Sequence, residues 1–247
     1  MNTIYILWLR QLKRYLRSRA RIVGSIGQPL LFLVALGFGL GPVFQKAGQG
    51  NYLEFLSPGV IAMGILFTAI FSGIEIIWDR QFGFLKETLV APVSRLEIMI
   101  GRTLGGATVA LLQGLIVFLI TIPLGFHPKL STLPIALMFM ILIALFFTAL
   151  GTAIASPLKD LQGFQLIMNF VIMPTFFLSG ALFPIDGLPQ VLKIPLMINP
   201  LAYGIDGMRG ALVGQAHFGM GFDFLILGIV TVVILGIGSY LFSKIQI

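Results

Sequence analysis

Few residues of this 247-residue chain could do chemistry, and they stand far apart. Glu75 is the one carboxylate inside a long apolar run, where an ionised side chain is costly and often functional. It lies one turn from the end of that run, within reach of Arg80 or Arg102, so we expect an interfacial ion pair. His127 and His217 have no second ligand at metal spacing and the chain has no cysteine, so we predict no metal site.

Sequence patterns that bind nucleotides or activate nucleophiles are missing as well. No serine stands in a nucleophile-elbow motif. No stretch matches G-x-x-x-x-G-K-[ST], the loop that cradles phosphates, and the chain has not even a Gly-Lys pair. We therefore predict a protein that is not itself an enzyme, with no catalytic residue and no cofactor of its own.

The composition is that of a helical membrane protein. Hydrophobic residues make up 57% of the chain and charged residues 10%, against about a quarter charged in soluble domains. The apolar runs are continuous rather than alternating, which favours helices over a membrane barrel. The net charge of +7 suggests a topological bias of Lys and Arg rather than a nucleic-acid partner.

Six apolar runs are each close to the roughly 20 residues that cross a bilayer as a helix. They cover residues 22–44, 58–78, 104–125, 133–156, 164–183 and 224–242. Ser57 and Pro58 look like the cap and first residue of the second helix. An even number of spans puts both termini on one side, and 12 of the 16 Lys and Arg residues share that side. By the positive-inside rule it is cytoplasmic, as in a multi-pass protein of a bacterial or archaeal plasma (inner) membrane.

Residues 1–21 form a predicted amphipathic helix that precedes the first span. One side is apolar and aromatic, whereas the other carries Arg10, Lys13, Arg14, Arg17 and Arg21. We expect this helix to lie in the headgroup plane of the inner leaflet, with Trp8 and Tyr15 as interfacial rings. Its cationic face would meet anionic lipid or a docked protein.

The segment from Trp78 to Arg102 holds seven of the 25 charged residues and lies between two apolar runs. A short helix over residues 81–91 would place Phe82, Leu85 and Leu89 on one face. Pro92 should end it, and Ser94 with Glu97 reads as a capping box that starts the next helix. A solvated loop is the alternative, but the apolar face favours contact with lipid headgroups or a partner protein.

Residues 184–213 are too broken by proline for a span and too apolar for an exposed loop. We expect them to enter the membrane from outside and return, with protein or water covering the broken backbone. Pro189 and Pro200 are suited to begin two short helices. Asp206 and Arg209, three residues apart, could pair. An ordinary extracellular cap is the alternative.

Two stretches of sequence resemble a known family. They are WDRQFGFLKETLVAPVSR after the second span, and FFLSGALFPIDGLP followed by INPLAYGIDGMRGAL before the last. Together they resemble the permease subunits of type-2 ATP-binding-cassette exporters, nearest to the daunorubicin-resistance-like multidrug branch. The resemblance covers nearly the whole chain. It implies an all-α membrane protein with one permease domain, residues 1–247, comprising an interfacial helix, six spans, a cytoplasmic coupling helix and an external re-entrant hairpin.

The resemblance also implies roles for particular residues. Docking on a separate ATPase would fall to Phe82, Leu85, Lys86, Glu87 and Leu89. The external gate would comprise Pro184, Pro189, Leu192, Met197, Pro200, Tyr203, Asp206 and Arg209. Two permease copies would work with two copies of the ATPase, which would use ATP and Mg. The solute, amphipathic and drug-like or lipid-like, would move out of the cytoplasm.

Other functions are compatible with parts of the sequence. Export of a lipid-linked polysaccharide would use the same architecture. An intramembrane hydrolase has little support, because its serines and histidines have no evident partners. An ion-coupled carrier is also weakly supported, since only Glu75 is buried in a span and no inverted repeat is evident.

Overall fold

The computed structural model describes residues 3–47, 50–84, 93–185 and 188–244, and within these ranges the regular structure is entirely helical. The first helices are α1 (Thr3–Arg17), α2 (Arg19–Lys46), α3 (Tyr52–Phe71), α4 (Ile74–Gln81) and α6 (Arg95–Thr121). They are followed by η1 (Leu130–Thr132), α7 (Leu133–Ala155), α8 (Leu161–Ile167), η2 (Met168–Ile172) and α9 (Met173–Phe177). The last are α10 (Gln190–Ile198), α11 (Pro200–Leu212) and α12 (Met220–Ser243).

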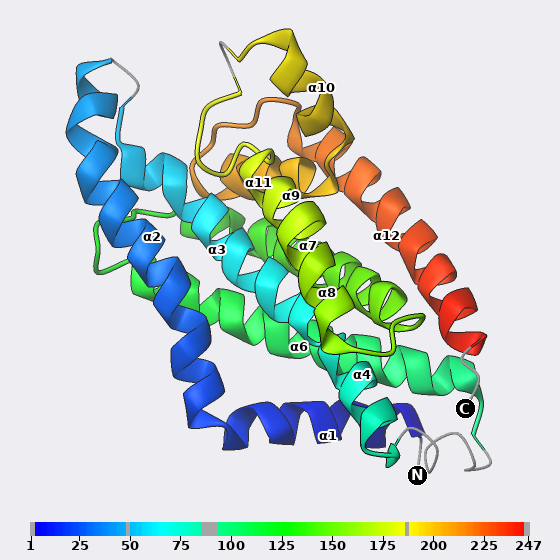
Figure 1. Cartoon of the computed structure of the whole chain (residues 1–247). Coiled ribbons are helices and arrows are strands. Elements are labelled where there is room, and N and C mark those ends of the chain that lie inside the picture. Colours follow the sequence, from blue (N-terminus) through cyan, green and yellow to red (C-terminus); the bar gives the residue numbers. More distant parts are fainter. Residues whose placement is uncertain (1–2, 48–49, 85–92, 186–187, 245–247) are drawn as a thin grey trace.

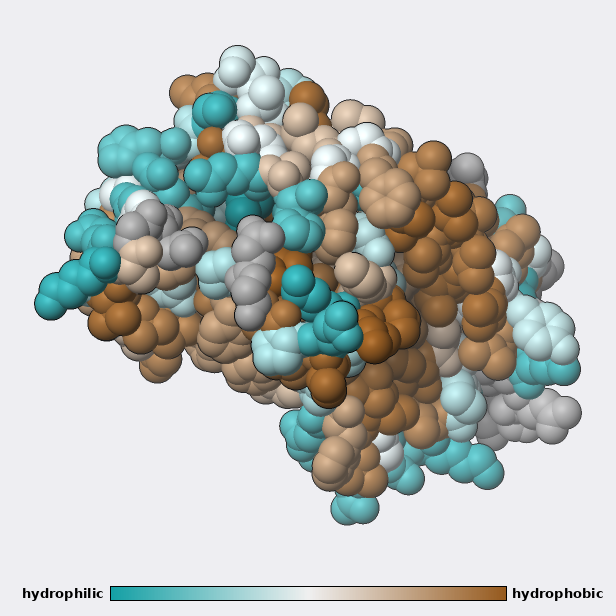
Figure 2. Space-filling view, turned by 90° about the horizontal axis from the view of Figure 1, so that it is seen from above, coloured by the Kyte–Doolittle hydropathy of each residue, from teal (hydrophilic) through white to brown (hydrophobic). Residues whose placement is uncertain are grey.

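The bundle is built around α3, which contacts α2, α6, α7 and α11 and is buried along almost its whole length. Helix α1 lies across the end of the bundle where α4 and α12 finish, and α10 lies at the opposite end (Figure 1). Helices α2 and α12 expose most of their apolar residues. Viewed from the α10 end, hydrophobic residues form a broad continuous area beside hydrophilic clusters (Figure 2). Such a surface suits contact with lipid tails.

Five helical segments of the described chain are long and apolar enough to cross a membrane: Ile22–Lys46, Tyr52–Gln81, Arg95–Thr121, Leu130–Ala155 and Met220–Phe242. The remaining predicted span, residues 164–183, is a shorter helical stretch, Leu161–Phe177, with a π-helical turn at its centre. The helix stops there because the chain turns at Ser179 and Gly180, where Gly180 has φ of 72°. The prediction from hydropathy therefore placed the end of this helix six residues too late, at residue 183 instead of Phe177.

The second predicted span begins earlier than its sequence suggests. Helix α3 starts at Tyr52, because the Asn51 side chain accepts a hydrogen bond from the Leu53 N–H at 3.0 Å. Pro58 therefore lies inside the helix, and the Ser57 hydroxyl donates to the Leu53 carbonyl rather than capping a terminus. The prediction that Ser57 and Pro58 begin this helix was wrong.

The start of α6 follows its local sequence. The Ser94 hydroxyl accepts from the Glu97 N–H at 3.2 Å, and the Glu97 carboxylate accepts from the Ser94 N–H at 3.3 Å. This is the predicted capping box, which satisfies two backbone donors at the helix terminus. The helix after the charged segment is thus fixed by residues three positions apart.

Helix α1 packs closely on α6 at two glycines one turn apart. A Cβ atom at Gly101 would stand 2.9 Å from the Leu7 Cβ and 3.1 Å from the Ile4 carbonyl oxygen. A Cβ at Gly105 would stand 2.7 Å from the Gln11 Cβ. The two helix backbones approach this closely only because α6 presents no side chain here.

Replacing Gly101 by leucine should therefore displace α1 from α6 and destabilise the protein by about 1–3 kcal/mol, the usual cost of overpacking. The thermal unfolding midpoint of the detergent-purified protein measures this loss. Gly27 in α2 is a matched control, since a Cβ there would meet nothing within 4 Å. Equal midpoints for Gly101→Leu and Gly27→Leu would contradict the packing of α1 described here.

Candidate functional site

The C-terminal end of α4 carries the first residues of the predicted docking segment. Helix α4 ends at Gln81, and Gly83 follows with φ of 81°, which breaks the helix where the sequence predicted a new one to begin. The Phe82 side chain is 72% exposed and that of Phe84 is 51% exposed, so both rings present apolar surface at the end of α4. The other docking residues, Leu85, Lys86, Glu87 and Leu89, lie outside the described residues.

A buried carboxylate binds α4 to its neighbours. Asp79 forms an ion pair with Arg102 of α6, and both side chains are almost completely buried. The other Asp79 oxygen lies 3.6 Å from the guanidinium of Arg10 on α1, which is half exposed. One aspartate therefore links three helices, and removing it would leave the Arg102 charge buried without a partner.

Glu75, one turn before Asp79, forms the expected ion pair but with a different cation. Its carboxylate lies 3.7 Å from the guanidinium of Arg14 on α1. The Arg102 side chain is paired with Asp79, and that of Arg80 points to backbone carbonyls. The sequence argument considered only cations near Glu75 in the chain or in the next span, whereas the fold brings α1 alongside.

Arg80 and Gln81 bind the opposite side of α4 to the segment after α7. Arg80 donates to the carbonyl oxygens of Ser156 and Leu158 at 2.7 and 2.5 Å. The Gln81 amide donates to the carbonyl oxygen of Lys159 at 3.5 Å. Together with the ion pairs, these bonds connect the end of α4 to α1, α6 and the α7–α8 connection.

Helix α1 is held more deeply than an interfacial helix needs to be. Tyr15 is only 1% exposed, and its hydroxyl donates to the Gln113 side-chain oxygen of α6 at 2.6 Å. The Trp8 indole donates to the Thr108 hydroxyl at 3.0 Å. The prediction that Tyr15 serves as an interfacial ring was wrong, because this side chain faces protein.

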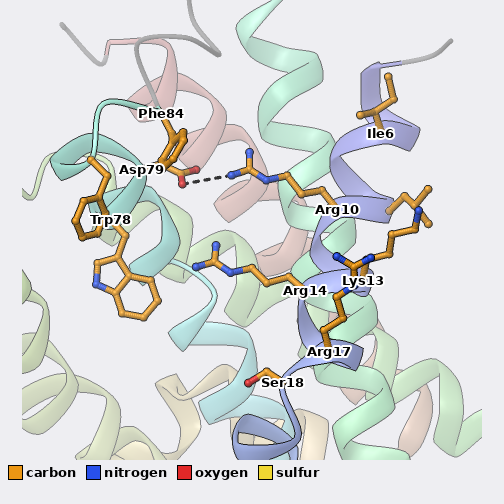
Figure 3. A pocket seen from close by; sticks show the side chains of 11 residues that line it. Ile6, Arg10, Lys13, Arg14, Arg17, Ser18, Trp78, Asp79 and Phe84 are labelled. Atoms are coloured by element: carbon orange, nitrogen blue, oxygen red, sulfur yellow. Dashed lines mark ion pairs between the residues drawn. The ribbon is translucent and has the colours of Figure 1, made fainter.

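A groove of about 720 Å³ separates α1 from α4. Trp78, Phe82 and Phe84 contribute aromatic rings to the wall formed by α4 and the residues after it. Four cations line the α1 wall: Arg10, Lys13, Arg14 and Arg17. Arg10 and Arg14 point from α1 toward α4 (Figure 3). The Arg14 guanidinium also lies 5.8 Å from the centre of the Trp78 ring, a cation–π distance.

Residues 184–213, which the sequence predicted to enter the membrane from outside, contain the two expected short helices. These two helices differ sharply in burial. Pro189 immediately precedes α10 and Pro200 is the first residue of α11, as predicted. Leu192 and Met197 of α10 are 40% and 50% exposed. Helix α11 is buried from Leu201 to Leu212 against α3, α7 and α12. Only the first of these helices presents apolar residues outward.

Asp206 and Arg209 are both buried but form no ion pair with each other, contrary to the predicted pairing. Asp206 accepts hydrogen bonds from the backbone N–H groups of His217 and Phe218 at 2.8–2.9 Å. Arg209 donates to the Gly180 carbonyl at 2.8 Å, and its guanidinium lies 4.0 Å from the centre of the Phe55 ring. Each charge thus fixes a different neighbour of α11.

The remaining external residues line or support the same region. Pro184 borders a cavity of about 520 Å³ that Asp206 and Arg209 also line. The Tyr203 hydroxyl donates to the Met197 carbonyl at 2.6 Å and so ties α11 to α10. Pro184, Asp206 and Arg209 thus share one cavity, Met197 and Tyr203 join the two helices, and Leu192 is 40% exposed.

Sequence reasoning missed Asp79 and Asn199. The sequence argument gave Asp79 no role of its own, although its spacing of four from Glu75 puts both carboxylates on one face of α4. The Asn199 amide donates to the carbonyls of Thr175 and Leu178, and its oxygen accepts from the Leu201 N–H. The Asn-Pro pair at the start of α11 was the available signal for this cap.

Comparisons with known proteins agree with this architecture. Residues 2–213 match the family model described as ABC-2 type transporter. Nodulation protein J of Rhizobium leguminosarum bv. trifolii is 32% identical over 213 residues, covering 85% of this chain and 79% of that protein. The protein named transport permease ycf38 in Cyanophora paradoxa is 28% identical over an alignment of 262 residues, covering 99% and 89%. Its namesake in Pyropia yezoensis is 34% identical over 203 residues, covering 78% and 68%.

The family match extends from α1 to the end of α11 and so includes both candidate regions, the C-terminal end of α4 and helices α10 and α11. Its relatives include proteins named as transport permeases, which fits a membrane subunit that is not an enzyme. This chain belongs to the ABC-2 type transporter family.

Proposed function

We propose that this chain is the membrane-spanning subunit of an ATP-driven exporter. Two copies of it work with two copies of a cytoplasmic ATPase, which binds ATP and Mg and docks on the segment that begins at Phe82. The complex moves an amphipathic, drug-like or lipid-like solute out of the cytoplasm. Family membership and the exposed Phe82 and Phe84 at the end of α4 support this assignment.

The attachment of α4 is the observation that carries the proposal. A segment that receives force from an ATPase must pass it to the membrane helices, and α4 is bonded to α1, α6 and the α7–α8 connection. Movement of its cytoplasmic end therefore acts on several helices at once. A solvated loop between spans would need none of these bonds.

The proposed topology follows from the charge distribution and the arrangement of the ends. Helix α1 and the end of α12 lie at the same end of the molecule as the end of α4 (Figure 1). We place this end in the cytoplasm, with Leu161–Phe177 as a short sixth span and α10–α11 as the re-entrant external segment. The cationic face of α1 supports this orientation, because anionic lipid is enriched in the cytoplasmic leaflet.

Export of a lipid-linked polysaccharide is the second candidate. It requires the same permease architecture, and a genomic neighbourhood rich in glycosyltransferases would favour it over a drug or lipid. The decisive experiment is co-purification of the ATPase with the permease, followed by transport in inverted vesicles. Transport that requires ATP supports the proposal, whereas transport driven by an ion gradient without ATP would contradict it.

A charge on α10 should test the external gate. Leu192 is partly exposed, so Leu192→Asp should leave folding and ATPase binding intact yet reduce ATP-driven transport at least tenfold, because the charge lies where apolar residues would close the outer route. Transport in vesicles measures the effect, and Gln190→Asp in the same helix, also exposed, is the matched control. Normal transport by Leu192→Asp would favour a passive external cap.

A further inference from the structure

The groove between α1 and α4 carries more positive charge than its carboxylates neutralise. Arg10, Lys13, Arg14 and Arg17 line it, while Asp79 is already paired with the buried Arg102. Lys13 and Arg17 have no hydrogen-bond or ion-pair partner among the residues that the structure describes. The groove thus presents uncompensated cations in a concave site, where they attract anions more strongly than on an open surface.

The orientation of these cations is set by the fold. The Arg10 and Arg14 guanidiniums lie 3.6 and 3.7 Å from Asp79 and Glu75, so both side chains are directed across the groove (Figure 3). Arginines that merely face lipid headgroups would project outward from α1. Here two of them form part of a wall, and a bound anion would meet them without further ordering of their side chains.

Two smaller cavities adjoin the groove. One, of about 420 Å³, shares Arg14, Ser18 and Trp78 with the groove and ends at Phe71. The next, of about 340 Å³, also touches Phe71 and lies between α2 and α3, where Met63, Phe67 and Pro29 line it. The lining therefore changes from cationic along α1 to mainly apolar between α2 and α3.

We infer that this groove binds an amphiphile with an anionic headgroup, such as a phosphate ester, from the inner leaflet. The headgroup lies among the α1 cations, and the apolar tail follows Trp78 and Phe71 toward the cavity between α2 and α3. A soluble anion would leave the apolar part empty, and a neutral amphiphile would leave Lys13 and Arg17 without a partner. That the bound amphiphile is the transported solute rests on the proposed function, whereas the binding of an anionic amphiphile to the groove does not.

The test uses the purified permease alone, in nanodiscs of phosphatidylcholine, with bromododecyl phosphate as the probe. Bromine quenches tryptophan on contact, so binding should appear as saturable quenching of Trp78, and Trp78→Phe should remove that signal. Lys13→Gln/Arg17→Gln should weaken binding at least tenfold without breaking an ion pair seen in the structure. Arg19→Gln, which removes one positive charge outside the groove, should bind as the natural chain does.

Two comparisons decide the chemistry and the source. The neutral probe bromododecyl maltoside should quench Trp78 at least tenfold more weakly. Nanodiscs containing phosphatidylglycerol identify the source: loss of probe binding there shows that a membrane phospholipid occupies the groove, and retained binding shows preference for a separate amphiphilic solute. Equal quenching by the two probes, or unchanged binding by the double variant, would overturn the inference. The assay contains no ATPase, so failure of the proposed docking would not affect it.

Discussion

Replacing Asp79 by alanine should destabilise the permease by about 3–5 kcal/mol, the typical cost of removing one partner from a buried ion pair. Arg102 would retain its charge in a buried site, and two of its guanidinium nitrogens already have no hydrogen-bond partner among the described residues. We expect a clear drop in the thermal unfolding midpoint in detergent. Transport should fall as well, because α4 would lose its ion pairs with Arg10 of α1 and Arg102 of α6 together.

Two further variants separate the buried charge from the surface pair. Arg10→Gln removes the half-exposed partner of Asp79 and should cost only about 0–1 kcal/mol, as exposed ion pairs do. Asp79→Ala combined with Arg102→Met should recover much of the lost stability, because no charge is then left buried. If Asp79→Ala were no less stable than Arg10→Gln, Asp79 would not hold these helices together.

Changing Leu85 to aspartate should abolish most of the binding between the permease and its ATPase. Burying a leucine contributes about 1.5–3 kcal/mol, and an unpaired charge in its place adds a desolvation penalty. Each 1.4 kcal/mol is a tenfold change in affinity, so the loss should exceed tenfold. Pull-down of the ATPase and its stimulated ATP turnover measure this effect.

The control for that experiment is Lys86→Ala, which removes an adjacent surface charge and should change binding by only about 0–1 kcal/mol. Both variants should still insert in the membrane and dimerise, because the predicted docking segment lies outside the spans. Should Leu85→Asp keep the partner at normal affinity, the segment would lie on lipid instead, and the docking role would be wrong.

The features predictable from sequence are those fixed by neighbouring residues. The capping box of Ser94 and Glu97 depends on one turn of chain. The fourth predicted span, residues 133–156, agrees with α7 to within one residue because its ends are marked by composition. Pro189 and Pro200 likewise begin helices through their own backbone constraints.

The features that sequence did not predict depend on residues far apart in the chain. Arg14 contacts Glu75, and Tyr15 contacts Gln113, only because the fold places α4 and α6 alongside α1. The hydrophobic periodicity of a sequence indicates which face of a helix is polar, but it does not indicate which other helix packs against that face. The same reason explains why Arg209 reaches Gly180 and Phe55 rather than Asp206.

The packing of α1 on α6 also imposes an order on synthesis. Helix α1 ends at Arg17 and α6 begins at Arg95, so 77 residues separate the end of one helix from the start of its partner. At about 5–20 residues per second, several seconds pass before the two glycines of α6 emerge. Until then the apolar face of α1, including Leu7 and Tyr15, lacks its partner helix α6. An amphipathic α1 can lie at the membrane surface during this time, because its cationic face stays exposed in the folded protein as well.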